Sequence, residues 1–180
     1  MNVFSERRLK AVIFVSFCLF LSACGAMMLT PSDAMVRGST SLDAEGYAER
    51  YAGNSIAFFR DKPGGPAQTE IYFGDDGSFY GVDLVRENIR YGTWTVHSVL
   101  GSSNININEV VAGISNGKAY RQGPAFVTLY TFVLPDGTAS TFSRSPEGPG
   151  VFVEPIPTPG FQARARFNAI KRKIDAALGS

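Results

Sequence analysis

The stretch Ala125-Phe-Val-Thr-Leu-Tyr-Thr-Phe-Val-Leu134 decides the fold that this sequence predicts. β-Branched and aromatic residues dominate it, and such residues favour the pleated, half-buried surface of a strand. Pro135-Asp-Gly137 follows directly and predicts a tight turn into a further strand over residues 138–143. We therefore expect an antiparallel sheet with residues 125–134 as a central strand.

Turn residues divide the preceding chain into short segments with the same character. Asp75-Asp-Gly77 is one such turn, because Asp-Gly tolerates the positive φ of a tight hairpin. In Asn104-Ile-Asn-Ile-Asn108 the alternation is strict, so the isoleucines share one face and the asparagines the other. The expected strands are 55–59, 69–73, 78–85, 89–96 and 104–108. This pattern predicts a mainly β fold, a small antiparallel β-barrel or sandwich.

A helix is expected on each side of the β region. Ser41 or Asp43 is suited to cap a short N-terminal helix that Gly53 ends. Residues 145–160 carry five prolines and predict an edge segment or a loop over the barrel. An amphipathic C-terminal helix is then expected over 162–178, from the helical spacing of Phe167, Ile170, Ile174 and Leu178.

The C-terminal helix is also basic. Residues 161–180 contain five basic residues and one acidic residue, whereas residues 24–160 contain nine basic and fourteen acidic residues. The basic side chains suit docking on anionic lipid headgroups or on an acidic partner. The alternative is a helix that docks on the barrel with its apolar side and leaves its charges in solvent.

The first residues of the chain predict a secretory signal. Arg7, Arg8 and Lys10 precede an apolar run over residues 11–21. This run is too short for a spanning helix, which needs about 20 apolar residues. The small residues Ser22 and Ala23 then fit the site at which a signal peptidase cuts.

Leu21-Ser22-Ala23-Cys24 resembles the lipobox of bacterial lipoproteins. The resemblance implies cleavage between Ala23 and Cys24, diacylglycerol on the Cys24 thiol, and a further acyl chain such as palmitate on the new amino group. Several chains give a stable anchor in the lipid bilayer, where one would not. Gly25 in place of Asp favours the outer membrane, facing the periplasm. The alternative is an ordinary signal peptide that is cut elsewhere, for example after Ala26.

The expected organisation has four parts. Residues 1–23 are the lipoprotein signal peptide, 24–42 a flexible tether, 43–160 the antiparallel β domain, and 161–180 the basic C-terminal helix. The chain has two cysteines: Cys18 lies within the expected signal peptide, and Cys24 lies at the expected cleavage site. A mature domain without a thiol has no disulfide, no cysteine metal ligand and no cysteine nucleophile, and it depends on its apolar core.

The sequence contains no recognisable catalytic constellation, so we expect no catalytic residue, no metal site and no cofactor. His97 is the only histidine, and no spacing assigns partners to it. The residues from Asp75 resemble a calcium loop only at its start, because Arg86 stands where the loop needs Glu. An enzyme would need acidic or hydroxyl residues that converge in a pocket, such as Asp83, Glu87 and Tyr91.

Two features suit binding. The amides of Asn104, Asn106 and Asn108 could bind a glycan or a peptide edge; the alternative is a solvated strand face. Gly92-Thr93-Trp94 is similar to the Gly-x-Trp signature of lipocalin-like barrels, where it belongs to the first strand. The order of motifs over residues 53–96 also resembles uncharacterised secreted barrels and barrel-type protease inhibitors of proteobacteria. Trp94 is expected either to bind a partner or to fill the barrel core.

These observations predict a membrane-anchored bacterial lipoprotein that acts as a non-enzymatic cell-envelope binding or accessory module. Its expected partner is an envelope protein or a cell-wall component, and not nucleic acid. The alternative is an inhibitor of a periplasmic hydrolase, of protease or lysozyme type, whose loop at residues 61–66 enters an active site. A wide, empty barrel would instead favour carriage of a small ligand.

Overall fold

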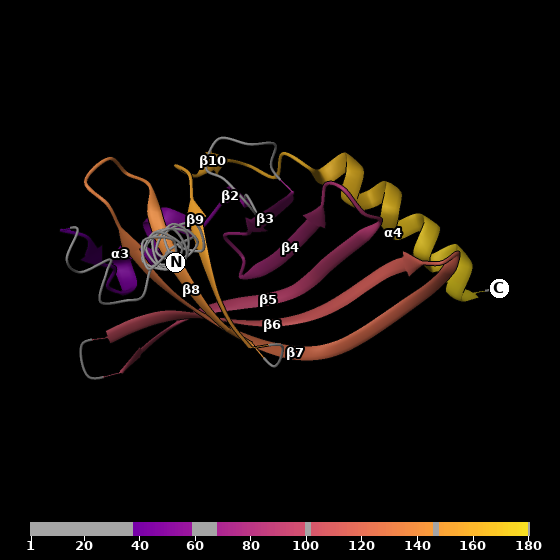
Figure 1. The fold of residues 1–180 in the computed structure, drawn as a ribbon, viewed down its shortest axis with the longest axis horizontal. Coiled ribbons are helices and arrows are strands. Elements are labelled where there is room, and N and C mark those ends of the chain that lie inside the picture. The colour runs from indigo at the N-terminus through magenta and orange to yellow at the C-terminus, as the bar shows by residue number, and fades with distance from the viewer. Residues whose placement is uncertain (1–37, 59–67, 100–101, 146–147, 180) are drawn as a thin grey trace, which may run out of the picture.

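The described part of the protein folds into one curled antiparallel sheet with two helices (Figure 1). The computed structural model describes residues 38–58, 68–99, 102–145 and 148–179. The elements are β1 (Thr40–Ser41), α3 (Ala44–Tyr51), β2 (Asn54–Phe58), β3 (Thr69–Phe73), β4 (Ser78–Asp83), β5 (Asn88–Val99), β6 (Ser102–Ser115), β7 (Lys118–Val133), β8 (Ala139–Ser145), β9 (Gly148–Glu154), β10 (Thr158–Pro159) and α4 (Arg164–Gly179). The sheet forms a half-barrel, which confirms the predicted mainly β, barrel-like fold.

From β2 to β9, strands that follow one another along the chain are neighbours in the sheet. The order is β10-β2-β3-β4-β5-β6-β7-β8-β9, and β1 pairs with the end of β7. The longest strands are β5, β6 and β7, which run across the molecule (Figure 1). The turn between β6 and β7 is Asn116-Gly117, and both residues have the positive φ that a two-residue hairpin requires.

The sheet carries a separate apolar cluster on each of its faces. Side chains alternate along a strand, so Phe79 and Val82 of β4 point to opposite faces. Phe79 belongs to a cluster with Trp94, Ile105 and the tyrosines of α3. We call this side the inner face, because α3 there contacts strands from both ends of the half-barrel. Val82 belongs to a second cluster with residues of α4 on the outer face.

Helix α3 fills one end of the half-barrel. Asp43 caps it as predicted, accepting a hydrogen bond from the Gly46 backbone N–H at 2.8 Å. Gly53 follows the helix with φ +71°, a conformation that favours glycine. The side chains of Tyr47 and Tyr51 are buried against the sheet. The predicted short helix is therefore confirmed, and its buried side is aromatic.

Helix α4 lies against the outer face near the β6–β7 hairpin (Figure 1). Phe167, Ile170 and Ile174 are buried as their spacing predicts, whereas Leu178 is 45% exposed. The apolar side of the helix is thus occupied by contacts with the sheet, as in the alternative in which it docks on the barrel. Part of its charge is paired within the molecule, since Lys171 and Arg121 both contact Asp175.

Neither helix in the described ranges has the length and apolar character needed to span a bilayer.

Candidate ligand-binding cavity

A cavity of about 280 Å³ lies on the inner face of the half-barrel. Strands β2 to β8 all contribute to its walls. The apolar lining residues are Phe58, Ile71, Phe79, Ile107, Val111, Ala125, Val127 and Leu129, with Gly123, and the polar ones are Thr69, Arg90, Glu109, Gln122 and Ser143. Its volume is just below that of typical small-molecule pockets, about 300–1,000 Å³.

Glycines keep part of the inner face free of side chains. Gly81 lies opposite Arg90 in the β4–β5 pair, and Gly92 lies opposite Glu109 in the β5–β6 pair. A Cβ atom at Gly81 would lie 3.2 Å from the Arg90 Cβ. A Cβ atom at Gly92 would lie 1.9 Å from the Asn108 carbonyl oxygen, so β6 could not approach β5 as it does. These two glycines allow the ionic side chains to lie beside the cavity.

The lining of the cavity is more apolar at one end than at the other, although the polar residues Thr69 and Ser143 lie opposite Phe58 and Leu129 at the apolar end. Phe58, Phe79 and Leu129 are buried and lie on the side that faces the α3 cluster. Gln122 and Gly123 are exposed and lie at the other end, beside Val111. A pocket that is apolar in its depth and polar at its opening suits a small amphipathic molecule.

An ion pair occupies the polar end. The Arg90 guanidinium donates a hydrogen bond from Nη1 to Glu109 Oε1 at 2.9 Å. The Arg90 side chain is 43% exposed, whereas that of Glu109 is 5% exposed. The carboxylate therefore lies inside the molecule, and the guanidinium connects it to solvent. A guanidinium has five N–H donors, so this one can serve a further acceptor.

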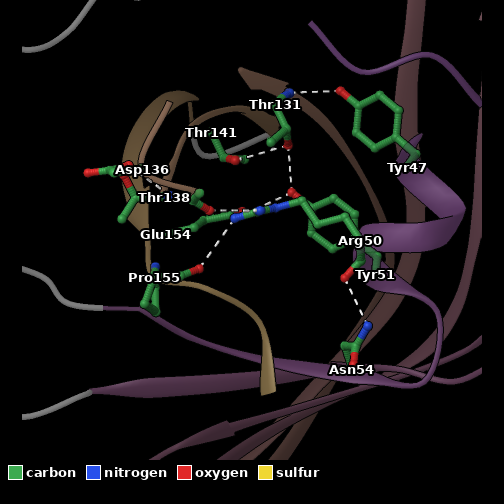
Figure 2. A network of polar contacts seen from close by, with 11 residues as sticks. Tyr47, Arg50, Tyr51, Asn54, Thr131, Asp136, Thr138, Thr141, Glu154 and Pro155 are labelled. Atoms are coloured by element: carbon green, nitrogen blue, oxygen red, sulfur yellow. Dashed lines mark hydrogen bonds and ion pairs between the residues drawn. The ribbon is translucent and has the colours of Figure 1, made fainter. Parts of the chain in front are cut away.

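A second polar cluster on the inner face is sealed from solvent (Figure 2). The Tyr51 hydroxyl donates to Glu154 Oε2 at 2.9 Å and lies 2.6 Å from Thr131 Oγ1. Thr131 Oγ1 in turn lies 3.0 Å from Thr141 Oγ1. Arg50 Nε lies 3.6 Å from Glu154 Oε2. We call these five residues the sealed network.

The titration of the sealed network reflects its burial. Burial raises the pKa of the Glu154 carboxyl, and the Thr141 hydroxyl and the Arg50 charge act in the opposite direction. Burial also raises the pKa of the Tyr51 hydroxyl well above its usual range, and the Glu154 charge adds to the shift. Glu154 and Tyr51 are fully buried, so a substrate has no access to them. The network ties α3 to β7, β8 and β9 and has a structural role.

The predicted asparagine row lies on the outer face, away from the cavity. Asn104, Asn106 and Asn108 pair with His97, Thr95 and Thr93 of β5 in the register of the sheet. Asn106 Oδ1 accepts a hydrogen bond from the Thr128 hydroxyl at 3.0 Å. The three asparagines are thus brought together as their alternation predicts. Their binding of a glycan or peptide remains a prediction.

Trp94 lies in the core of the inner face and does not line the cavity. Its ring packs edge-on against Phe73, with the ring centroids 5.5 Å apart. Its indole N–H donates to the Gly74 carbonyl oxygen at 2.9 Å. The side chain therefore occupies the position expected of a residue that fills the barrel core.

The acidic and hydroxyl residues considered for an enzyme do not converge. Asp83 accepts hydrogen bonds from the backbone N–H groups of Val85 and Arg86, and Glu87 pairs with Lys173 of α4. Tyr91 lies on the outer face and Asp83 on the inner face, as the register of β4 and β5 shows. In the described part of the chain, no group of three or more His, Cys, Asp and Glu side chains is arranged to hold a metal ion.

Several predicted residues lie outside the described ranges. These are Ala23 and Cys24 of the lipobox and the loop at residues 61–66. Acylation at Cys24 and inhibition through that loop therefore remain predictions.

Arg90, Glu109 and Gln122 form the polar end of the cavity, and no sequence motif had identified them as site residues. A local signal was available, because Asn116-Gly117 separates two segments rich in β-forming residues and predicts a two-residue hairpin. That hairpin places Val111 opposite Gln122, and Val111 also lies opposite Arg90 on the next strand. The curl of the sheet, which turns this row into a cavity wall, has no comparable local signal.

The chain matches no protein-family model, no curated protein and no solved structure with which it was compared. The fold and the cavity describe a half-barrel with a solvent-accessible, largely apolar site.

Proposed function

We propose that this protein is a bacterial lipoprotein, anchored in the cell envelope through acylated Cys24, that acts by binding a small, largely apolar molecule in the inner-face cavity. It is a binding module and not an enzyme. The observation that carries the proposal is the cavity of about 280 Å³, whose described lining includes eight apolar side chains and one ion pair.

The packing of the inner face supports a binding role. Helix α3 fills one end of the half-barrel with two buried tyrosines, yet no described side chain fills the space between Phe79 and Gln122. An apolar molecule in that space would remove both its own surface and the lining from water, which is favourable by about 25 cal/mol per Å². The walls belong to paired strands, so the site is formed before a ligand arrives.

The first 24 residues support the envelope location. The basic start, the short apolar run and Leu21-Ser22-Ala23-Cys24 match what a lipoprotein needs for export and acylation. A tether between Cys24 and β1 would let the half-barrel reach a ligand released from the membrane or from an envelope partner.

The binding site is tested by photocrosslinking. The probe is octanol with a diazirine in its chain, added to the full chain in lipid nanodiscs, and the attachment sites are read by mass spectrometry. We expect attachment to inner-face residues of β5, β6 and β7. Attachment only to outer-face residues, or to no residue of the protein, would overturn the proposal.

Two tryptophan variants in neighbouring positions of β7 provide the control. Val127 lines the cavity, whereas Phe126 points to the outer face and is 68% exposed. Val127→Trp should fill the cavity and reduce attachment at least about tenfold, a change equivalent to about 1.4 kcal/mol. Phe126→Trp should leave attachment unchanged. Circular dichroism confirms folding of each variant, and Ala125→Leu is the milder replacement if Val127→Trp does not fold.

The anchor is tested separately with Cys24→Ala. Metabolic labelling should show acyl chains on the wild-type protein. Membrane fractionation should place that protein in the outer membrane. Loss of the label and of outer-membrane residence in Cys24→Ala is the expected result. A variant that stays in the membrane would contradict the lipoprotein assignment, whatever the cavity binds.

A further inference from the structure

A second cavity lies on the outer face, where the β3–β4 turn meets the start of α4. Its volume is about 480 Å³, within the range of small-molecule pockets, about 300–1,000 Å³. Phe79 lines the inner-face cavity and its neighbour Tyr80 lines the second one, so the two cavities lie on opposite faces of β4. They share no described lining residue. We call the second cavity the outer-face pocket.

The deeper lining of the outer-face pocket is aromatic. Tyr72 and Tyr80 lie directly opposite each other in the β3–β4 pair, with their rings stacked and the centroids 6.4 Å apart. Phe161 stacks on both rings, at 5.2 and 5.6 Å. Phe167 is buried and packs edge-on against Tyr80 at 5.3 Å. These rings hold one another in place, so the aromatic surface is formed before a ligand arrives.

The rim of the outer-face pocket is polar and exposed. Asp75 and Asp76 come from the β3–β4 turn. Arg164 and Asn168 lie one turn apart on α4. Among the described residues, none of the three charged groups takes part in an ion pair. The Arg164 guanidinium lies 5.8 Å from the centre of the Phe161 ring, and the N–H groups at its edge remain available to an acceptor.

An aromatic surface below a hydrogen-bonding rim matches the two kinds of surface on a sugar ring. The C–H groups on one face of a hexopyranose carry weak positive charge, so they pack favourably on the negative face of an aromatic ring. The hydroxyls around the edge of the sugar both donate and accept hydrogen bonds. They can donate to the Asp75 carboxylate and accept from Arg164 and Asn168 at the same time.

Other classes of ligand match the outer-face pocket less well. An apolar chain would remove water from the polar rim without replacing its hydrogen bonds. An anion would approach the carboxylates of Asp75 and Asp76. A cation would approach the Arg164 guanidinium, which already lies beside the Phe161 ring. An uncharged sugar has none of these conflicts.

We propose that the outer-face pocket binds a neutral hexopyranose unit of a glycan, with the sugar ring packed on the aromatic surface and its hydroxyls bonded to Asp75, Arg164 and Asn168. The site is separate from the inner-face cavity, so this inference goes beyond the proposed function and does not depend on it.

The proposal is tested by saturation-transfer NMR on the full chain in lipid nanodiscs, with empty nanodiscs as the background. The probes are cellotriose, maltotriose and triacetylchitotriose, and tetramethylammonium is the charged comparison. We expect saturation of at least one trisaccharide, strongest at the C–H protons of one ring face. Excess octanol should leave that signal unchanged, because it enters the other cavity. Saturation of no trisaccharide at about 10 mM, or of tetramethylammonium alone, would overturn the proposal.

Two arginines of α4 provide matched variants at exposed positions. Arg164 lines the outer-face pocket, whereas Arg166 is exposed and is not among the lining residues. Arg164→Ala should weaken binding of the trisaccharide at least about fivefold, and Arg166→Ala should leave it unchanged. Equal affinity in the two variants would contradict the assigned role of Arg164, and tighter binding of tetramethylammonium than of sugar by Arg164→Ala would indicate a cation site instead.

The aromatic surface is tested with Tyr72→Leu, which keeps an apolar side chain but removes the ring. Binding of the trisaccharide should weaken at least about tenfold. The control is Tyr130→Leu, which removes a partly exposed ring of β7 that does not line the pocket. Circular dichroism confirms the fold of each variant. Unchanged sugar affinity in folded Tyr72→Leu would contradict the proposed packing of the sugar ring.

Discussion

The inner face carries two arginine–glutamate pairs in very different surroundings. In the sealed network, drawn in Figure 2, Arg50 and Glu154 lie close together. Their side chains are 10% and 0% exposed. At the cavity those of Arg90 and Glu109 are 43% and 5% exposed. The first pair is surrounded by hydroxyls of α3, β7 and β8, and the second borders the cavity. The same two residue types therefore fix a helix in one place and border an open cavity in the other.

The difference in solvent access decides which role each pair can have. A buried pair has lost its hydration, so removing one partner leaves an uncompensated charge. An exposed arginine that loses its partner is solvated by water instead. Removing the carboxylate at the cavity should therefore cost much less stability than removing the carboxylate of the sealed network.

The largest effect is expected from Glu154→Ala. This change leaves the Arg50 charge buried and removes the acceptor of the Tyr51 hydroxyl, so the free energy of unfolding should fall by about 3–5 kcal/mol. Urea denaturation measures it. The matched change at the cavity is Glu109→Ala. It should lower the free energy of unfolding by clearly less, because the Arg90 side chain reaches solvent. Equal losses in the two variants would contradict the comparison.

A change of pH is expected to have an intermediate effect on the free energy of unfolding. Burial raises the folded-state pKa of Glu154 above its unfolded value, so the folded protein retains a proton that the unfolded chain releases. This contribution to stability is fully present below the unfolded pKa, about 4.3, and is lost as pH rises through the folded pKa. Glu154→Gln should remove the part of the fall in unfolding free energy with rising pH that Glu154 causes. Denaturation of both proteins between pH 4 and pH 8 tests this, and an identical pH profile would refute it.

The smallest effect is expected on the outer face. Lys173 of α4 pairs with Glu87, and both side chains are largely solvated. Lys173→Ala should change the unfolding free energy by less than about 1 kcal/mol, because exposed ion pairs contribute little. Thermal melting measures the change. A loss as large as that of Glu154→Ala would show that the outer-face charges stabilise the fold in a way that their exposure does not predict.

Much of the fold follows from local sequence signals. Asp43 caps α3, the Asp-Gly turn after Asp75 joins β3 to β4, and the apolar spacing of α4 identifies the residues that pack on the sheet. The strands β6 and β7 are longer than predicted, because residues 109–124 contain Gly and Pro that weaken a strand pattern. Hydrogen bonding to the long neighbouring strands keeps these residues in β structure, with a register shift between Glu109 and Val111.

The candidate site was much less predictable. Arg90 and Glu109 are 19 residues apart and meet only through the register of β5 and β6. The cavity also depends on glycines at positions 81 and 92, whose role is visible only when neighbouring strands are in place. Trp94 and the asparagine row were conspicuous in the sequence, yet they lie in the core and on the outer face. Residue type alone does not show which face of a curled sheet remains empty.

The most direct test of this account is an isotope-filtered NOE measurement on the labelled full chain with octanol. The account predicts contacts from the terminal methyl group of octanol to the methyl groups of Ile107 and Leu129, in the apolar part of the cavity. It also predicts contacts from the carbon that bears the hydroxyl to the side chain of Arg90. Contacts confined to outer-face residues such as Phe126, or no intermolecular contacts at ligand excess, would contradict the claim that the inner face binds a small apolar molecule.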